Sequence, residues 1–295
     1  MIGEPLNPRA VRMDLESTRK VLRIIHSEDR KVPRAVAREI PRIARAVDMI
    51  VKALRQGGRL IYVGAGTSGR LGLLDAAECP PTFNTSPDMV RAVLAGGRRA
   101  VTRAVEGAED SSSLGQRDMR RLRLSKRDVV VGLSASGNTP YTVAALALAR
   151  RRGAQTVAVT THPRSKAALL AEVSIAPVVG PEVIAGSTRM KAGTAQKLVL
   201  NMLSTAAMIR LGYTYGGWMI NVRRTNRKLM RRAERILEQT TGVGTAAARR
   251  AMRRAGGNTR VALIMLKLGC PAREARRKLA EAGGELRRAL GEIAR

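Results

Sequence analysis

Cysteine and histidine are almost absent from this sequence. Its 295 residues include two cysteines, Cys79 and Cys270, and two histidines, His26 and His162. Two cysteines can build neither a disulfide framework nor a four-cysteine zinc site, and no His-Glu-x-x-His motif is present. This shortage argues against a metal hydrolase and against a histidine-based catalytic triad. Acid–base chemistry would have to come from carboxylates or lysines.

Aromatic residues and long apolar runs are scarce too. Phe, Trp and Tyr make up 2% of the chain, whereas apolar residues as a whole make up 44%. The core must therefore be aliphatic, and base-stacking platforms for single-stranded nucleic acid are not expected. No stretch approaches the roughly 18 apolar residues of a membrane span, and residues 1–16 lack the apolar segment of a signal peptide. We expect no membrane association and a reducing, cytoplasmic location.

Acidic residues are outnumbered: the chain has 23 of them against 54 lysines and arginines, a formal net charge of +31. One interpretation is a basic nucleic-acid-binding protein, which would bind DNA with a steep salt dependence. The basic residues, however, recur through predicted helices in pairs such as Arg231 with Arg232 and Arg253 with Arg254. This spacing favours solvated helix faces over one basic recognition segment, so no specific nucleic-acid partner is expected.

The hydrophobic pattern predicts an α/β fold. Helical spacing appears over 11–28 and 33–57, and short aliphatic runs then alternate with helical stretches. The runs predict strands at 59–66, 89–96, 128–136, 155–161 and 171–178. The stretches between and after them predict helices at 69–77, 98–106, 111–122, 139–152 and 190–211. This alternation predicts a doubly wound, parallel, five-stranded sheet with helices on both faces.

Only helices are predicted after residue 223, and they are separated by glycines. The expected ranges are 223–240, 244–256, 258–268, 271–282 and 284–294. The chain should thus comprise N-terminal helices over 1–49, a domain built around the predicted sheet over 50–213 and a small helical module over 214–295.

Three polar loops are expected at or near the carboxyl ends of the strands, where ligands bind in open α/β folds. They read GAGTSGR (64–70), SASGNTP (134–140) and GSTRMKAGTAQK (186–197). Hydroxyl and backbone N–H groups at a helix N-terminus favour a phosphate, although ordinary helix capping would explain any one such loop. The expected phosphate ligands in the first two loops are Gly66, Thr67, Ser68, Ser134, Ser136, Gly137 and Thr139. In the third loop Thr188 and Lys191 are weaker candidates, and a structural role for Lys191 is equally reasonable.

Two glutamates are candidates for acid–base work. Glu78 follows the predicted helix 69–77, where a carboxylate gains nothing from the helix dipole. Glu109 lies in VEGAEDS (105–111), after the second predicted strand. The alternatives are that Glu78 is a surface charge and that Glu109 and Asp110 cap the next helix.

Together these motifs resemble the N-acetylmuramic acid 6-phosphate etherases, a family of the sugar-isomerase (SIS) domain superfamily. The resemblance rests on GAGTSGR followed by ECPP (78–81), VEGAEDS, SASGNTPY (134–141) and STRMKAGTAQK, and it covers roughly residues 10–290. It implies a homodimeric lyase of cell-wall recycling that needs no metal or other cofactor. The substrate would be a small phosphosugar whose D-lactyl ether is cleaved, and the resemblance makes 50–213 the SIS domain that binds this phosphosugar and carries out the catalysis.

The resemblance also implies roles for the two glutamates. Glu78 corresponds to the proton donor to the leaving oxygen, and Glu109 to the second catalytic residue. An acid that works near neutral pH needs a raised pKa, so we expect Glu78 to be partly buried. Asn138 departs from the family, where Arg is common, and Ala77 replaces a frequent Ser. The alternatives are a non-catalytic phosphosugar-binding regulator and an aldose–ketose isomerase.

Overall fold

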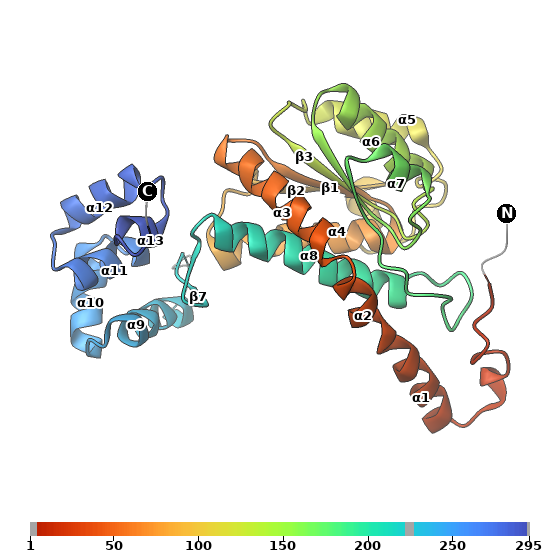
Figure 1. Cartoon of the computed structure of the whole chain (residues 1–295), viewed down its shortest axis with the longest axis horizontal. Helices are drawn as coiled ribbons and strands as arrows, with labels where there is room; N and C mark the ends of the chain where they lie inside the picture. The colour runs from red at the N-terminus through yellow and green to blue at the C-terminus, as the bar shows by residue number, and fades with distance from the viewer. Residues whose placement is uncertain (1–4, 222–226, 294–295) are drawn as a thin grey trace. The chain divides into compact units, whose positions relative to one another are not determined.

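The computed structural model describes residues 5–221 and 227–293 (Figure 1). Its contacts divide the chain into two compact units. The sheet unit comprises Met1–Ala76 and Asp88–Ser204, and the helical unit comprises Ala77–Pro87 and Thr205–Arg295. This division differs from the three segments expected, because the N-terminal helices join the sheet and the last residues of two long helices, 77–83 and 205–210, join the helical unit.

The sheet unit contains five parallel strands in the order β2-β1-β3-β4-β5, which confirms the predicted fold class. The strands are β1 (Leu60–Gly64), β2 (Val90–Leu94), β3 (Val129–Leu133), β4 (Gln155–Val159) and β5 (Val173–Ile175). Every residue of β1 and β3 is buried, as expected for central strands that are covered on both faces.

Helices cover both faces of this sheet (Figure 1). One face packs against α3 (Ile40–Arg55), α4 (Gly66–Phe83) and α8 (Lys191–Arg210), and the other against α5 (Ser112–Arg121), α6 (Pro140–Arg151) and α7 (Lys166–Leu170). On the first face the Tyr62 hydroxyl donates to Asp75 of α4 at 2.8 Å. On the second face Ile61 and Val63 pack in a cluster with Leu146 of α6. The short 3-10 helix η2 (Gly97–Val101) follows β2, and the short α7 was not predicted.

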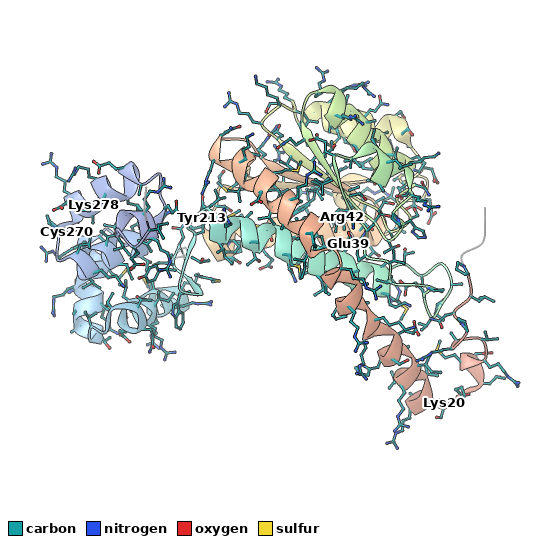
Figure 2. The ribbon with its side chains drawn as sticks, viewed as in Figure 1. Lys20, Glu39, Arg42, Tyr213, Cys270 and Lys278 are labelled. Atoms are coloured by element: carbon teal, nitrogen blue, oxygen red, sulfur yellow. The ribbon has the colours of Figure 1, made fainter. Side chains whose placement is uncertain are left out.

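The N-terminal helices are more broken than the sequence predicted. The expected helix 11–28 is the 3-10 helix η1 (Met13–Leu15) followed by α1 (Thr18–Asp29), and the expected helix 33–57 is α2 (Lys31–Ala37) followed by α3. The second break falls at Glu39, since Pro41 in the first turn of α3 cannot donate a helical hydrogen bond. The Glu39 carboxylate accepts from Ala176 N at 2.9 Å and pairs with Arg42 (Figure 2). This contact fastens α3 to the end of β5.

Helix α4 is longer than predicted, because it continues past residue 77 to Phe83. Pro80 and Pro81 lie in its last turn, where they remove two hydrogen bonds but still fit helical backbone angles. The helix ends at Asn84, which has a positive φ of 54° and donates its N–H to Pro80 O at 2.9 Å. Asn221 then donates its side-chain amide to Phe83 O at 2.7 Å.

The helical unit has its own aliphatic core. A small antiparallel hairpin, which was not predicted, joins β6 (Thr214–Tyr215) to β7 (Trp218–Met219). The helices are α9 (Arg227–Thr241), α10 (Thr245–Arg254), α11 (Thr259–Leu268), α12 (Ala272–Glu281) and α13 (Leu286–Ala289). They confirm the predicted all-helical module, although residues 222–226, including the expected start of the first helix, lie outside the described residues. No helix within the described ranges is long and apolar enough to cross a bilayer.

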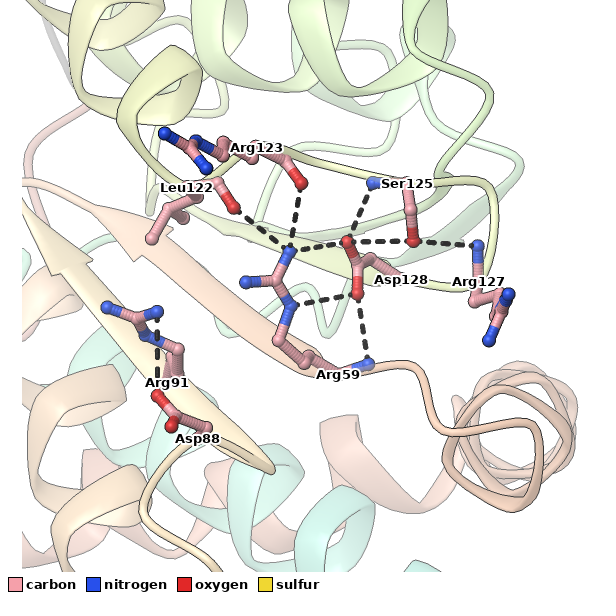
Figure 3. A network of polar contacts seen from close by, with 8 residues as sticks. All are labelled: Arg59, Asp88, Arg91, Leu122, Arg123, Ser125, Arg127 and Asp128. Carbon is pink, nitrogen blue, oxygen red and sulfur yellow. Dashed lines mark hydrogen bonds and ion pairs between the residues drawn. The ribbon is translucent and has the colours of Figure 1, made fainter.

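The amino-terminal edge of the sheet is held by an ion pair between neighbouring strands (Figure 3). Asp128, just before β3, accepts from the backbone N–H and from the guanidinium of Arg59, just before β1, at 2.8–3.0 Å. The same carboxylate accepts from Ser125 N at 2.8 Å, and the guanidinium also donates to Leu122 O at 3.1 Å. Burial alone would raise the pKa of Asp128, but the hydrogen bonds from Arg59 outweigh it and lower that pKa.

Candidate active site

The candidate site lies at the opposite, carboxyl-terminal edge of the sheet. The strand order reverses between β1 and β3, where β1 continues to β2 on one side and β3 to β4 on the other. Gly64 pairs with Leu133, so the loops that follow the two strands emerge side by side. Such a reversal is the usual ligand site in doubly wound folds. The first two predicted loops therefore meet where a ligand is expected.

Three hydroxyl groups gather in the second loop, 134–139. Ser134 is 3% exposed, and its Oγ lies 2.8 Å from Thr139 Oγ1 and 3.4 Å from Ser136 Oγ. Ser134 Oγ also accepts from Gly137 N at 2.9 Å, and Ser136 Oγ accepts from Asn138 N at 3.2 Å. The loop is thus folded around its own hydroxyls directly before the N-terminus of α6. We call Ser134, Ser136 and Thr139 the hydroxyl cluster.

Gly137 is required by the geometry of this loop. Its φ is +67°, and a Cβ at this position would lie 2.0 Å from Ser165 Oγ and 2.7 Å from Thr160 Oγ1. Its carbonyl accepts from Ala167 N at 2.9 Å. Only glycine combines that backbone conformation with so close an approach. The second loop is therefore held against the segment that follows β4.

The first loop leads directly into α4, which begins at Gly66. Gly66 has a φ of +52°, and a Cβ on Gly69 would lie 2.5 Å from Gly64 O. The glycines of this loop thus allow the helix to start close against its own strand. Ser68 is buried and Thr67 is half-buried at this start. The N-terminus of α4 consequently faces the same edge of the sheet as the hydroxyl cluster, as an anion site requires.

The third loop lies beside the first, but its helix start is already capped. A Cβ on Gly193 would lie 3.5 Å from Thr67 Cγ2 and 3.6 Å from Thr188 O. The Glu182 carboxylate accepts from the backbone N–H groups of Lys191 and Ala192, at 3.0 and 2.9 Å. An acidic side chain therefore occupies the position that a phosphate would take at α8.

Lys191 forms a buried ion pair. It is 1% exposed, and its ammonium donates to Glu28 of α1 at 2.7 Å. Burial alone would raise the pKa of Glu28, but hydrogen bonds from Lys191 and Lys31 lower it to about 2. This arrangement favours the structural interpretation of Lys191 over a ligand role. Lys191 thereby connects α1 to the start of α8.

Glu109 lies close to the hydroxyl cluster. Its carbonyl accepts from Tyr141 N at 3.0 Å, so its turn lies against the first residues of α6. Its side chain is exposed. The cap of α5 is Ser111, whose Oγ accepts from Leu114 N at 3.2 Å, so the alternative in which Glu109 or Asp110 caps that helix is wrong.

Glu78 is exposed in this chain, and the expectation that it is partly buried is wrong. The reason is helical periodicity, since Asp75, Ala76 and Cys79 take the buried face of α4 and turn Glu78 outward. Glu78 is twelve residues after Gly66, so the rise of an α-helix puts it about 18 Å along α4 from the helix start. Within one chain, α4 therefore keeps Glu78 away from the first loop, which lies at the N-terminal end of the helix.

A fourth segment at this edge was missed from the sequence. Thr160 and Thr161, directly after β4, both donate side-chain hydroxyls to Ala135 O in the second loop, each at 2.9 Å. Only a threonine pair at the end of a predicted strand could have indicated it. Among the described residues, no group of three His, Cys, Asp or Glu side chains could hold a metal ion.

Comparisons with known proteins give this arrangement a family. The SIS domain model matches residues 106–206, and the model of the glucokinase regulatory protein N-terminal SIS domain matches residues 42–150. An N-acetylmuramic acid 6-phosphate etherase of Brucella anthropi is 51% identical over 290 residues, 98% of this chain and 94% of that protein. The chain belongs to the N-acetylmuramic acid 6-phosphate etherase family. An etherase of Yersinia pestis is 52% identical, with 98% of each chain covered.

Solved structures agree with the fold of this etherase family member. Phosphoheptose isomerase from Neisseria gonorrhoeae superposes with a TM-score of 0.50 at 19% identity, over 64% of this chain and 97% of that one. At this identity the likeness concerns the fold alone. The SIS fold and the etherase resemblance expected from the motifs are both confirmed.

Proposed function

We propose that this chain is a carbon–oxygen lyase that cleaves the D-lactyl ether of N-acetylmuramic acid 6-phosphate in cell-wall recycling. The products are D-lactate and N-acetylglucosamine 6-phosphate. The observation that carries this proposal is the identity of 51–52% to etherases over nearly the whole chain. The geometry at the strand-order reversal supports it, because the site offers hydroxyl groups and helix N-termini for a phosphate. We place the reaction in the cytoplasm, where phosphorylated sugars are retained.

The substrate phosphate binds at the hydroxyl cluster and at the start of α4. Ser134, Ser136 and Thr139 offer hydroxyls, and the first turns of α4 and α6 add backbone N–H groups with a favourable dipole. Gly66, Thr67, Ser68 and Gly137 shape the cradle, and Thr188 borders it through its contact with Gly193. Its members are neutral, so the loops bind the anion through hydrogen bonds.

The reaction is an elimination followed by hydration. In the open-chain sugar the C1 aldehyde makes the C2 proton acidic, and a base removes it. The C2–C3 double bond forms as the C3–oxygen bond breaks, and an acid gives its proton to the departing lactyl oxygen. Water then adds its oxygen to C3 while a proton returns to C2. We assign Glu78 to the proton transfer to the leaving oxygen and Glu109 to the second acid–base role.

We also propose that the enzyme works as a homodimer and that Glu78 serves a sugar bound by the partner copy. The position of Glu78 along α4 supports this arrangement, because α4 carries it away from its own first loop. Helix α1 supports a second copy too. Its only buried residue is Glu28, and Leu22 on its surface is 60% exposed. A helix of twelve residues is marginal in water without packing of its apolar side chains, so the exposed Leu22 suits a face that a second copy covers.

Lactate release by a Glu78→Gln variant tests the catalytic assignment. We expect the release to fall below detection while the circular dichroism spectrum and the unfolding midpoint stay unchanged. Glu106→Gln, an exposed glutamate in the same turn as Glu109, is the matched control and keeps full activity. Lactate release by Glu78→Gln at the wild-type rate would contradict the assignment.

Mixed dimers test whether the two glutamates come from different chains. Glu78→Gln and Glu109→Gln homodimers are each inactive, and we mix them at equal amounts and let the subunits exchange. If each site combines glutamates from two chains, half of the dimers carry one intact site, and about a quarter of wild-type activity returns. No recovery, with subunit exchange verified by mass spectrometry, would contradict the shared site.

Heavy-oxygen water separates elimination from hydrolysis. The proposed reaction puts the label on C3 of N-acetylglucosamine 6-phosphate, whereas attack on the lactyl carbon would put it in lactate. A non-catalytic regulator of the same superfamily would bind the phosphosugar and release no lactate at all.

A further inference from the structure

The segment after β4 forms a wall beside the second loop. Ala135, between Ser134 and Ser136, has a carbonyl oxygen that accepts from Thr160 Oγ1, Thr161 N and Thr161 Oγ1, each at 2.9 Å. The next residue, His162, brings its ring to the same oxygen, with Nδ1 at 3.1 Å. An imidazole therefore lies against the loop that carries the hydroxyl cluster.

The hydrogen bonds of His162 determine its tautomer. A carbonyl oxygen can only accept, so Nδ1 must carry the hydrogen that bonds to Ala135 O. Nδ1 also lies 3.1 Å from Thr161 Oγ1, whose single hydrogen is already directed to Ala135 O, so this hydroxyl accepts as well. The other ring nitrogen, Nε2, is left as the proton acceptor. His162 is exposed, and no residue of the described ranges forms a hydrogen bond with Nε2.

We propose that His162 belongs to the anion site, and that its imidazolium form supplies the positive charge that the neutral hydroxyl cluster lacks. The inference rests on the proposed function, because it assumes that the phosphate binds at the second loop. No residue of that loop, 134–140, carries a charge. On protonation Nδ1–H keeps its bond to Ala135 O, and Nε2–H becomes a charged donor. Hydrogen bonds from charged donors to phosphate are the stronger kind.

Charged groups on the neighbouring elements set the surroundings of this imidazole. Its own segment carries Arg164 and Lys166, and both are exposed. The turn before α5, which touches the start of α6, carries Glu109 and Asp110. Beyond β5, residues 176–180 carry no charge, and the Glu39 carboxylate that reaches this segment is bonded to Ala176 N and to Arg42. None of these charged groups forms a hydrogen bond with the ring, so Nε2 is available to a bound dianion.

Sulfate binding to the full chain tests this inference without the substrate's own titration. Sulfate keeps two negative charges at about pH 5.5 and at about pH 8, whereas an imidazole ordinarily changes its charge between them. We expect the wild type to bind sulfate about tenfold more tightly at the lower pH, as measured by calorimetry and by competitive inhibition of lactate release. His162→Asn keeps an N–H donor for Ala135 O but cannot ionise, so its sulfate affinity should differ little between the two pH values.

Three further proteins complete the experiment. His26→Asn changes the other histidine, which is exposed on α1, and should keep the wild-type pH dependence. His162→Gln is a second non-ionisable variant in case His162→Asn is unstable. Ser134→Ala should weaken sulfate binding at both pH values, because it removes a hydroxyl of the cluster.

Each outcome decides between the inference and the function on which it rests. If both His162 variants keep the wild-type pH dependence while Ser134→Ala weakens binding, the role of His162 is wrong and the phosphate site stands. If Ser134→Ala also binds like the wild type, or the wild type binds no sulfate at either pH, the phosphate site fails together with the inference.

Discussion

The two edges of the sheet hold their polar groups in opposite ways. At the amino-terminal edge, Arg59 and Asp128 are charged, and they bond to each other and to the surrounding backbone (Figure 3). At the carboxyl-terminal edge, Ser134 and Thr139 are neutral hydroxyls folded over a loop. Asp128 is 1% exposed and both of its oxygens accept hydrogen bonds, so this carboxylate is not free to bind a ligand. The hydroxyls can exchange one hydrogen bond for another, which suits them to bind a phosphate.

The difference shows that charge at a conspicuous place in a sheet is not evidence of a site. The charged edge joins β1 to β3 and serves stability. The neutral edge lies at the carboxyl ends of β1 and β3, and we propose that it serves binding. Substitutions at the two edges should therefore affect different quantities, the free energy of unfolding at one edge and substrate affinity at the other.

The largest effect is expected for Asp128→Asn. Removing one charge from a buried pair leaves Arg59 without its counter-ion, and we expect the free energy of unfolding to fall by about 3–5 kcal/mol. Urea unfolding measures it. Asp88→Asn is the matched control, because Asp88 pairs with Arg91 at 3.6 Å while 78% of its side chain is exposed. Such a surface pair is worth about 0–1 kcal/mol. A similar loss in both variants would show that the amino-terminal edge is not special.

Gly137→Ala comes next, with an expected loss of about 3 kcal/mol in the free energy of unfolding. The left-handed backbone costs an alanine about 1–2 kcal/mol, and the contact with Ser165 Oγ adds more. Gly107→Ala separates the two contributions, because Gly107 has a φ of +69° and open space around it. Equal losses in the two variants would mean that the contact with Ser165 is not important. A higher KM should accompany the Gly137 variant alone.

Ser134→Ala should change activity more than stability. A hydrogen bond to a charged group contributes about 1.5–3 kcal/mol, so we expect kcat/KM for the phosphosugar to fall about 10- to 100-fold. The unfolding free energy should fall by only about 1 kcal/mol, the usual value of a neutral hydrogen bond. Ser125→Ala, at the amino-terminal edge, should leave kcat/KM unchanged. If Ser134→Ala lowered the free energy of unfolding but left kcat/KM unchanged, the proposal that this edge serves binding would be contradicted.

The smallest effect is the pH dependence of the charged edge. The pKa of Asp128 is lowered in the folded chain, so the unfolded chain takes up the proton first. The ion pair's contribution to the free energy of unfolding is fully present above about pH 4, near the ordinary pKa of aspartate. It is lost as the pH falls through the pKa that Asp128 has in the folded chain. Urea unfolding at pH values between about 5 and 2 should show this loss in the wild type and a smaller one in Asp128→Asn. Identical slopes would contradict it.

Local patterns predicted the elements well where propensity and tertiary contacts agree. The five strands and most helices appear within a few residues of their predicted positions. The ends that were misplaced depend on contacts far away in the sequence. Pro41 favours a break at Glu39, and the hydrogen bond from Ala176 N to the Glu39 carboxylate holds it there. Helix α4 runs through Pro80 and Pro81 to an end where Asn221 bonds to Phe83 O.

The site was predicted in part for the same reason. Strand order put the loops at 64–70 and 134–140 together, because parallel neighbours end at one edge of a sheet. For Lys191 the sequence left a ligand role and a structural role equally reasonable, and the structure favours the second by placing Glu28, 163 residues away in the chain, against its ammonium. Glu78 was expected to be partly buried because a general acid needs a raised pKa, yet its position on the helical turn of α4 exposes it.

The sequence by itself determined the composition of the site and the kind of fold. The shortage of histidine and cysteine left carboxylates and lysines as candidates for the acid–base groups, and the alternation of aliphatic and helical segments predicted a parallel sheet. Tertiary structure alone decided which polar groups are available. Lys191, Glu182 and Asp128 are buried and held in internal hydrogen bonds, whereas Ser136 and Thr139 are half-buried and His162 is exposed at the carboxyl-terminal edge. Availability depends on which partners folding brings within hydrogen-bond distance, and those partners lie far apart along the chain.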